Sequence, residues 1–276
     1  MRDLIQDLRA EQEDLDRVVA GLPERSWDLL TPAAPWTIRD TISHLAFFDE
    51  RQTEAITDPD AFAAEINQRL GEEAAAYMAA GLDRGRALTP AGVLAWWRTA
   101  RGSELAAFAT VDAEERVLWY GPPMRARSAV TARLMETWAH GQDVTDALGI
   151  VRRPTNRLFA IAELGVKTFS WSFTNRGLVV PAERVRVALR GPSGSERVWN
   201  DEWSNSITGP VDDFCLVVTQ RRHYLDTALV IEGAVARHWM EIAQVFAGPP
   251  GPGREPSRAP QPATEPAPAP TPASPP

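Results

Sequence analysis

The sequence feature that most constrains the fold is a glutamate and a histidine four residues apart, Glu136 and His140, inside an apolar segment that runs from Leu134 to Asp143. On an α-helix this spacing places the two side chains one above the other on the same face. Because the neighbouring residues are mostly apolar, we expect that face to point to the protein interior. A buried carboxylate beside a buried imidazole is unfavourable unless hydrogen bonds or a metal ion compensate it. A metal site built on this pair needs a third ligand.

His44 is the best candidate for that third ligand. It lies in a second apolar segment, residues 36–48, in which Ile38, Ile42 and Leu45 form a helical stripe. Two imidazoles and one carboxylate match the ligand set of catalytic zinc sites and of other first-row metals. The predicted site is therefore His44, Glu136 and His140. We expect it to hold a divalent metal ion, zinc before others, with coordination positions left open for water or substrate.

Each of these residues also has a purely structural interpretation. Glu136 and His140 can form a buried polar pair satisfied by neighbouring side chains, since this spacing also arises by chance. His44 can be a hydrogen-bonded core histidine. Asp143 either accepts a hydrogen bond from His140 and so fixes its tautomer, or belongs to a solvated turn of the helix. The metal site is favoured because both segments are amphipathic and place their polar residues on apolar faces.

Four long amphipathic segments in the first 150 residues predict a four-helix bundle, because apolar residues recur in each at helical spacing. In such bundles, metal sites are assembled from inward side chains of facing helices. We expect Thr37 with Asp40, Thr89 and Ser128 to cap three of these helices. The segments are residues 3–21, 36–48, 90–108 and 128–148, and an alanine-rich helical segment at 59–81 has an expected break near Gly71.

Beyond Val151 the pattern changes to that of a small α+β domain. Residues 183–189 alternate between polar and apolar with period two, and a turn at 191–194 leads back into a second strand at 195–199. Helices are expected at 155–173, from Gly209-Pro210 through Val218, and at 233–246, and a third strand at 204–208. From Gly248 onward proline and small residues dominate, which predicts a disordered or polyproline-like tail. The predicted fold class is mainly α with a smaller α+β part: a bundle at 1–150, a small α+β domain at 151–247 and a disordered Pro/Ala-rich tail at 248–276.

Composition excludes several classes of partner. The 276 residues carry a formal net charge of -8, so neither nucleic acid nor an anionic membrane is an expected partner. The single cysteine, Cys215, cannot form an internal disulfide and is expected to be a buried, inert thiol. The N-terminus has no apolar signal segment, and no run of 18 apolar residues exists to span a membrane. We expect a cytoplasmic protein.

Two segments, Trp36–Ala46 and Glu136–Val144, resemble the signature stretches of the DinB-like metal-binding four-helix bundles. The resemblance is closest to the mycothiol-dependent maleylpyruvate isomerase family of actinobacteria. It implies a bundle followed by a small α+β domain distantly like sterol carrier folds. The family's ligands, two histidines and a glutamate, fall on His44, Glu136 and His140. The resemblance further implies zinc as the usual metal and mycothiol, a low-molecular-weight thiol, as cofactor or substrate.

The resemblance also implies an arginine of the second domain that helps to bind an acidic substrate. Arg221 or Arg222 is the nearest candidate for a catalytic role, and the alternative is a surface arginine pair. We expect neither His223 nor His238 to be a metal ligand. Trp119 and its neighbour Tyr120, in a loop between two bundle helices, are expected to cover the mouth of the site.

The function expected from these features is a metal-dependent isomerase or S-transferase. Its partners would be a small-molecule thiol, held by the metal as the nucleophilic thiolate, and an electrophilic substrate. Two alternatives stay open from the residues alone. One is a metal-binding sensor or interaction protein without catalysis. The other is a metal-dependent hydrolase in which metal-bound water is the nucleophile.

Overall fold

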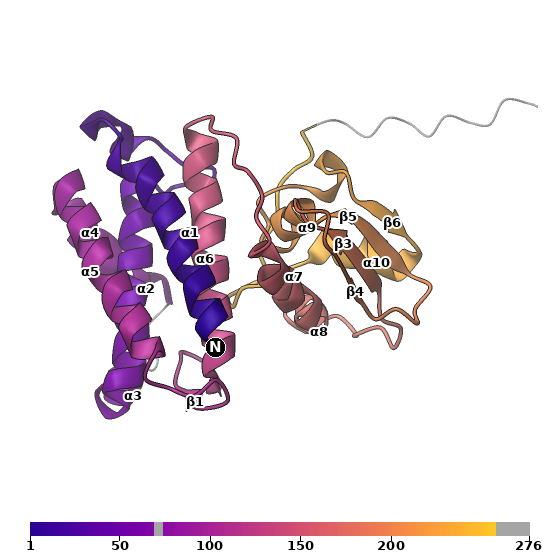
Figure 1. The fold of residues 1–276 in the computed structure, drawn as a ribbon, viewed down its shortest axis with the longest axis horizontal. Helices are drawn as coiled ribbons and strands as arrows, with labels where there is room; N and C mark the ends of the chain where they lie inside the picture. Colours follow the sequence, from indigo (N-terminus) through magenta and orange to yellow (C-terminus); the bar gives the residue numbers. More distant parts are fainter. Residues whose placement is uncertain (69–73, 258–276) are drawn as a thin grey trace, which may run out of the picture.

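The structure of the chain, a computed structural model, describes residues 1–68 and 74–257, so the expected break near Gly71 lies outside it. Figure 1 shows a helical bundle joined by an extended segment, residues 148–157, to a smaller unit of helices and strands. None of the described helices is both long and apolar enough to cross a membrane. The bundle contains α1 (Arg2–Ala20), η1 (Glu24–Asp28), α2 (Ile38–Thr57), α3 (Pro59–Gln68), α4 (Ala74–Arg86), α5 (Pro90–Phe108), β1 (Arg116–Val117), β2 (Met124–Arg125) and α6 (Ala126–Ala147).

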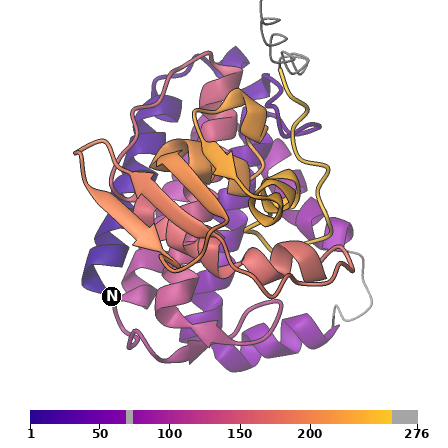
Figure 2. The ribbon, with the colours of Figure 1, turned by 90° about the vertical axis from the view of Figure 1, so that its right-hand side faces the viewer.

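The smaller unit is built on a four-stranded sheet with the strand order β4-β3-β5-β6. β3 and β4 form the predicted antiparallel hairpin, and β5 runs parallel to β3. Figure 2 shows this unit in front of the bundle. The predicted fold class, mainly α with a smaller α+β part, is confirmed. The elements are α7 (Leu158–Lys167), α8 (Phe169–Thr174), β3 (Arg186–Arg190), β4 (Glu196–Trp199), β5 (Ser206–Pro210), α9 (Val211–Val218), η2 (Tyr224–Asp226), β6 (Val230–Glu232) and α10 (Ala234–Ile242).

α6 belongs to the cores of both parts. Val144 packs in the cluster of buried apolar side chains inside the bundle, together with Ile42 of α2. Leu134 and Trp138 belong to a second cluster that continues into the smaller unit through residues such as Phe214. A continuous apolar core therefore holds the smaller unit against the helix that carries Glu136 and His140.

The helix starts follow the predicted signals in two of three cases. Thr37 and Asp40 form a reciprocal capping box at the start of α2, and Thr89 caps α5. The prediction for Ser128 is wrong, because α6 begins at Ala126, with no side-chain cap. The reason is that the first-turn N–H groups of Ala126 and Arg127 donate to the carbonyls of Glu115 and Ala113. Backbone carbonyls of the preceding loop thus replace a capping side chain.

A buried ionic network fixes α2, α5 and α6 relative to one another. Arg133 of α6 donates to Asp49 of α2 at 2.6 Å and to Glu104 of α5 at 3.1 Å, and all three side chains are buried. Trp97 also donates to Asp49, and Gln12 of α1 donates to Glu104. Burial and the nearby Asp49 charge raise the pKa of Glu104 well above its usual range. Arg133 opposes both effects, because its positive charge and hydrogen bond favour the ionised form of Glu104.

Residues 248–257 differ from the predicted disordered tail because they lie against the smaller unit. Gln244 donates to the Gly248 carbonyl and accepts from the Gly251 N–H, and Ser257 pairs with Asp226. Arg254 reaches back to the bundle, where it donates to the Pro32 carbonyl. Prolines and glycines leave this segment without regular structure, but its backbone groups find partners on the protein surface. The remainder of the predicted tail, 258–276, lies outside the described residues.

Substituting Arg133 with alanine should strongly destabilise the bundle. The variant leaves Asp49 and Glu104 buried without their cation, and breaking a buried ion pair in this way costs about 3–5 kcal/mol. Urea unfolding followed by circular dichroism measures the change. Arg127→Ala is the matched control, because Arg127 lies on the same helix but forms an exposed pair with Glu114, which is worth at most about 1 kcal/mol. Equal losses in the two variants would contradict a structural role for the network.

Candidate metal centre

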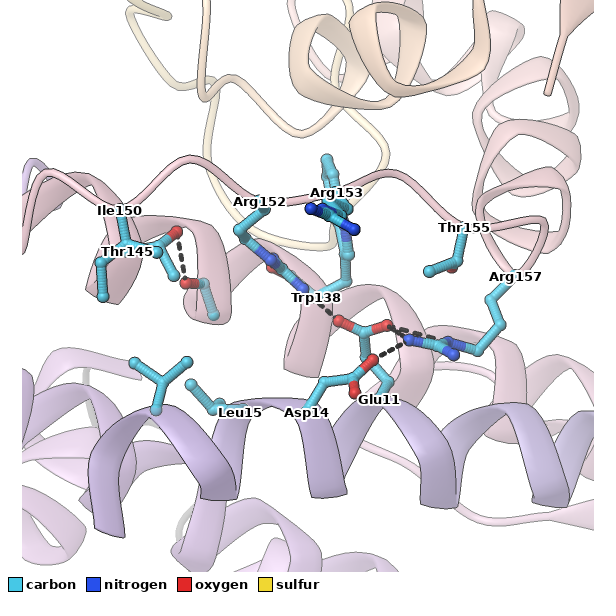
Figure 3. A pocket seen from close by; sticks show the side chains of 12 residues that line it. Glu11, Asp14, Leu15, Trp138, Thr145, Ile150, Arg152, Arg153, Thr155 and Arg157 are labelled. Carbon is cyan, nitrogen blue, oxygen red and sulfur yellow. Dashed lines mark hydrogen bonds and ion pairs between the residues drawn. The ribbon is translucent and has the colours of Figure 1, made fainter. Parts of the chain in front are cut away.

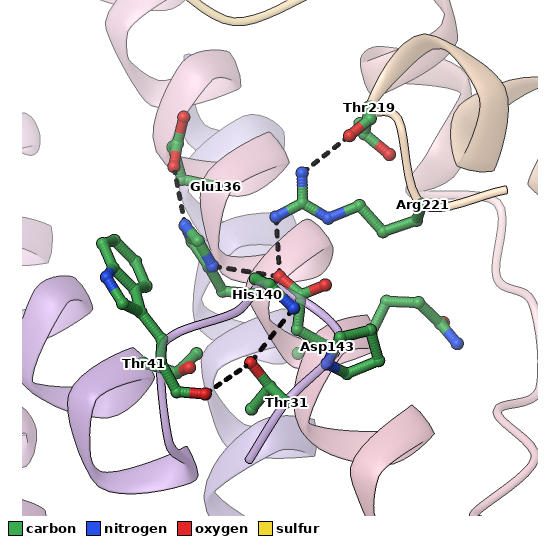
Figure 4. A network of polar contacts seen from close by, with 12 residues as sticks. Thr31, Thr41, Glu136, His140, Asp143, Thr219 and Arg221 are labelled. Carbon is green, nitrogen blue, oxygen red and sulfur yellow. Dashed lines mark hydrogen bonds and ion pairs between the residues drawn. The ribbon is translucent and has the colours of Figure 1, made fainter. Parts of the chain in front are cut away.

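Helices α2 and α6 bring His44, Glu136 and His140 together. Glu136 Oε2 lies 3.3 Å from His140 Nε2 and 3.8 Å from His44 Nε2. The possible ligand atoms of all three residues lie within 4.8 Å of one another, the one such group found among the described residues. Figure 4 shows Glu136 and His140 facing each other along α6. The three residues that the sequence singles out from two distant segments thus form one cluster.

The geometry of the cluster fits a divalent metal ion. Tetrahedral ligands about 2.1 Å from a zinc ion lie about 3.4 Å from one another, close to the two separations from Glu136. Both imidazoles turn their Nε2 atoms to the same carboxylate oxygen. Two nitrogens and one oxygen are a donor set that zinc and other first-row metals accept. Metal binding by His44, Glu136 and His140 is therefore consistent with the structure and stays a prediction.

Asp143 stands behind His140, away from the cluster. Its Oδ2 atom lies 3.3 Å from His140 Nδ1 and accepts a hydrogen bond from Arg221 at 2.7 Å. The side chain of Asp143 is fully buried. Figure 4 shows the continuous line of polar contacts from Glu136 through His140 and Asp143 to Arg221. Asp143 therefore favours the tautomer with the proton on Nδ1 and leaves Nε2 directed at the cluster.

The two histidines differ in their electrostatic surroundings. Burial lowers the pKa of His44 to about 4, because its contact with Glu136 offsets only part of the lost hydration. Burial also lowers the pKa of His140, but the contacts with Asp143 and Glu136 outweigh it and the net shift is upward. The pKa of Glu136 lies well below its usual range, since its contacts with the imidazoles outweigh the effect of burial. At neutral pH the cluster therefore offers an ionised carboxylate and a neutral His44.

Trp36 is a residue whose role sequence reasoning missed. It immediately precedes the N-cap of α2, and its ring lies 4.8 Å from the His44 ring and stacks on the His140 ring at 5.6 Å. The loop before it is held by Thr31, which donates to the Trp36 carbonyl, and by Arg254 through Pro32. Arg254 also lies 3.6 Å from Asp143 Oδ1, a buried atom with no hydrogen-bond partner among the described residues. The segment after the last helix thus touches both the Trp36 loop and the residue behind His140.

Arg221 and Arg222 are both engaged with carboxylates of α6. Arg221 donates to Asp143 and to the Thr219 carbonyl. Arg222 pairs with Asp146 at 2.6 Å, so the adjacent arginines contact successive acidic positions on one face of the helix. These pairs fasten the smaller unit to the bundle beside the candidate metal centre. Direct substrate binding by either arginine stays a prediction.

Aromatic side chains extend from His44 along the side of the cluster. Phe48, one turn after His44 on α2, lies 4.7 Å from its ring. Phe48 in turn contacts Trp119 and Tyr120 of the loop between β1 and β2, at 6.1 and 6.0 Å. This is the loop in which we expected aromatic residues to cover the mouth of the site. Its rings reach His44 only through Phe48, and a covering role stays a prediction.

The other chemically notable groups lie outside the cluster. His223 and His238 contact aromatic rings of the smaller unit, and Cys215 is fully buried with its thiol directed at the Leu158 carbonyl. A cavity of about 290 Å³ lies where α1 and α6 meet the extended segment (Figure 3). Two of its arginines, Arg152 and Arg157, pair with Glu11. The cavity contains none of the three candidate ligands.

The fold and the site define a helical-bundle protein with a candidate two-histidine, one-glutamate metal centre. The chain belongs to the family of the mycothiol maleylpyruvate isomerase N-terminal domain, whose model matches residues 8–145. It is also similar to two Mycobacterium tuberculosis proteins, uncharacterized protein MT0041 (strain CDC 1551 / Oshkosh) and uncharacterized protein Rv0036c (strain ATCC 25618 / H37Rv). Each is 44% identical to this chain over 251 residues, and each alignment covers 91% of this chain and 97% of the relative.

The solved structures with the same fold include the mycothiol-dependent maleylpyruvate isomerase and a histidine-to-alanine mutant of it. The TM-scores are 0.55 and 0.54, at 16% identity, and each comparison covers 80% of this chain and 89% of the other. At that identity the likeness concerns the fold. The resemblance noted from the two signature segments is confirmed at the level of the family.

Substituting Asp143 with asparagine should weaken metal binding about 10- to 100-fold, the usual effect of losing a carboxylate behind a metal-ligating histidine. The variant removes the charge that orients His140 and leaves Arg221 as an uncompensated cation nearby. Zinc titration against a competing chelator measures the affinity. Asp146→Asn is the control, since Asp146 lies one turn further along α6 and pairs with Arg222 instead. Similar affinities for the two variants would argue against a role of Asp143 through His140.

Metal binding should displace a proton from His140 and none from His44. At pH 6 His44, with a pKa of about 4, is neutral, whereas His140, whose pKa is raised above 6.5, carries a proton. The metal competes with that proton, so affinity rises with pH until His140 is neutral. Calorimetry in two buffers of different ionisation enthalpy should show about one proton released at pH 6, falling towards zero as the pH passes the His140 pKa. Release of two protons at pH 6 would contradict a neutral His44.

Proposed function

We propose that this protein is a metal-dependent enzyme that uses a low-molecular-weight thiol, mycothiol or a close analogue, to isomerise or conjugate an electrophilic substrate. The observation that carries the proposal is the cluster of His44, Glu136 and His140, which supplies three ligands in a protein of the mycothiol maleylpyruvate isomerase family. We take zinc as the expected metal because the donor set suits it.

The position of Asp143 supports an enzyme more than a closed structural metal site. A structural zinc site has four protein ligands, whereas a catalytic one keeps a position for water or substrate. Asp143 is the nearest further carboxylate on α6, but it contacts the Nδ1 side of His140 and is engaged with Arg221. It therefore does not serve as a fourth ligand beside Glu136. Three ligands and an open position are what a thiol-binding centre requires.

The chain has no thiol of its own for this chemistry. Cys215 is fully buried, and burial raises its pKa well above the usual range. A buried thiol in apolar surroundings is not a nucleophile. The nucleophile in the proposed reaction is therefore an external thiol.

The residues around the cluster have separate roles in this proposal. A bound divalent metal ion would lower the pKa of a coordinated thiol and hold it as the thiolate. His44, Glu136 and His140 would hold the ion, and the buried Arg133 network keeps their helices in register. Asp143 orients His140, and Trp36 packs on both imidazoles and covers that side of the cluster. The thiol and the electrophile would approach from the remaining side, where Glu136 keeps 26% of its side chain exposed.

Metal analysis of purified protein tests the shared premise of this proposal. We expect the parent protein to hold about one equivalent of metal, and His44→Ala and Glu136→Ala to lose most of it. His223→Ala is the control, because His223 lies in the smaller unit and contacts Tyr224. Unchanged metal content in both site variants would exclude the proposed centre.

A thiol-consumption assay separates the enzyme from the two alternative functions. Metal-loaded protein should accelerate the reaction of mycothiol with an electrophile, and Glu136→Ala should abolish the acceleration. Glutathione and cysteine serve as comparison thiols. Failure of all three thiols with metal-loaded protein would favour a non-catalytic metal-binding protein. Hydrolysis of an activated ester without added thiol would instead favour the hydrolase.

A further inference from the structure

We propose that the electrophile taken by this site is an uncharged aromatic compound. The inference rests on the proposed function and specifies its substrate class. It differs from what the name of the maleylpyruvate isomerase suggests, since maleylpyruvate is a dicarboxylic acid. Two features of the structure carry it: the rings that extend from His44, and the pairing of the nearby arginines.

The rings form a continuous aromatic wall, defined as Phe48, Trp119 and Tyr120. Phe48 contacts the His44 ring directly, and Trp119 and Tyr120 contact both Phe48 and each other. The buried Phe62 of α3 holds the wall from behind, stacked on Trp119 at 6.1 Å and against the edge of Tyr120 at 5.4 Å. Phe48 and Trp119 are half-buried and Tyr120 is 39% exposed.

Partly exposed rings beside a reactive centre favour an aromatic ligand. Such rings bind other rings by offset or edge-to-face contacts. Because Phe48 contacts the His44 ring, a ring bound against the Phe48 end of the wall would lie beside that candidate ligand. Binding pockets of small-molecule enzymes commonly combine an apolar lining with a few polar groups. Here the polar groups are those of the candidate metal centre itself.

The arginines near the cluster are already neutralised. Arg133 and Arg221 are the cations whose charge is felt at His44 and His140. Arg133 is buried between Asp49 and Glu104, and Arg221 is paired with Asp143. Arg254, the third arginine near the cluster, shares Asp143 at 3.6 Å and donates to the Pro32 carbonyl. Glu136 and a bound thiolate would together balance the charge of a divalent metal ion, so the centre itself would offer no net positive charge to a substrate carboxylate. Such a carboxylate would have to break one of the arginine pairs to gain a counter-ion. An uncharged substrate avoids that cost.

Arg51 and Arg116, which lie three residues from Phe48 and from Trp119 in the chain, are also engaged. Arg51 pairs with Glu54 and Glu65. Arg116 of β1 donates to the Pro123 carbonyl and so braces the loop that carries Trp119. Arg116 has no acidic partner among the ion pairs of the described residues. It is therefore the residue that we would expect to bind the carboxylate of an acidic substrate.

A matched pair of electrophiles tests the charge preference. The probes are 4-phenylbut-3-en-2-one, which is neutral and aromatic, and the same enone with a carboxylate para on its ring. In both, the thiolate sulfur bonds to the β-carbon, the π pair of the C=C bond moves towards the carbonyl, and a proton adds at the α-carbon. The adduct is the sum of thiol and enone, so no other reactant is needed. The two probes differ by one charge at the ring.

With metal-loaded full-length protein and mycothiol, we expect kcat/KM for the neutral enone to exceed that for the carboxylate at least tenfold. Trp119→Ala should lower kcat/KM for the neutral enone about tenfold or more, the scale of losing an apolar pocket contact, and should leave the metal content unchanged. Tyr120→Ala, at a more exposed position, should act in the same direction and covers the case in which Trp119→Ala misfolds. Trp171→Ala is the control, because Trp171 is partly exposed on the smaller unit.

Three results would overturn the inference. The first is an equal or better rate with the carboxylate, and loss of that rate in Arg116→Ala would identify the residue that binds the acid. The second is a preference for the neutral enone over the carboxylate that stays unchanged in both wall variants, Trp119→Ala and Tyr120→Ala, when both retain their metal. The third is no reaction of either enone with metal-loaded protein and any of the three thiols, which would reject the proposed function together with this inference. The first two results leave the proposed function standing.

Discussion

The candidate metal centre depends on the fixed register between α2 and α6. His44 comes from one helix and Glu136 and His140 from the other, so sliding either helix by one turn would separate them. The register is set by Arg133, three residues before Glu136, which pairs with Asp49, five residues after His44. In a low-dielectric interior a charge has few alternative partners, so this pair specifies one alignment of the helices. The apolar stripes alone tolerate more than one alignment.

Asp143 connects the centre to the rest of the molecule. On one side it contacts His140, and on the other it pairs with Arg221 of the smaller unit and lies near Arg254 of the final segment. Side chains from three separate parts of the chain thus converge on one buried carboxylate. Through Asp143, the smaller unit and the residues after it contribute to the orientation of His140, a candidate ligand of the bundle. This gives the two-part architecture a chemical role beyond packing.

The chemistry proposed here follows from what the chain supplies and what it leaves to its ligands. The protein offers one buried, inert thiol, three candidate metal ligands and a wall of aromatic rings. A soft external thiol and a flat, uncharged electrophile complement those features. The nearby cations, in contrast, are committed to structural pairs. An enzyme of this family can therefore keep the thiol-activating centre while the surroundings of the centre decide which electrophile is accepted.

The sequence by itself determined those features that depend on local spacing. Glu136 and His140 share a helix face because 3.6 residues make a turn. The capping box of Thr37 and Asp40 needs only four consecutive residues. The alternation of polar and apolar residues in 183–189 indicated the first strand of the hairpin. The apolar stripe around His44 made it the candidate third ligand, and the family resemblance pointed to the same residue. The sequence did not reveal the start of α6, because carbonyls of a preceding loop take the place of a cap at Ser128.

Only the tertiary structure showed that the Trp36 ring packs on both imidazoles and that Arg221 is paired with Asp143. It also showed that Arg254, from the segment after the last helix, lies near Asp143. These contacts join residues distant in the chain, and their partners are chosen by packing and by the pairing of buried charge, neither of which leaves a periodic signal in the sequence.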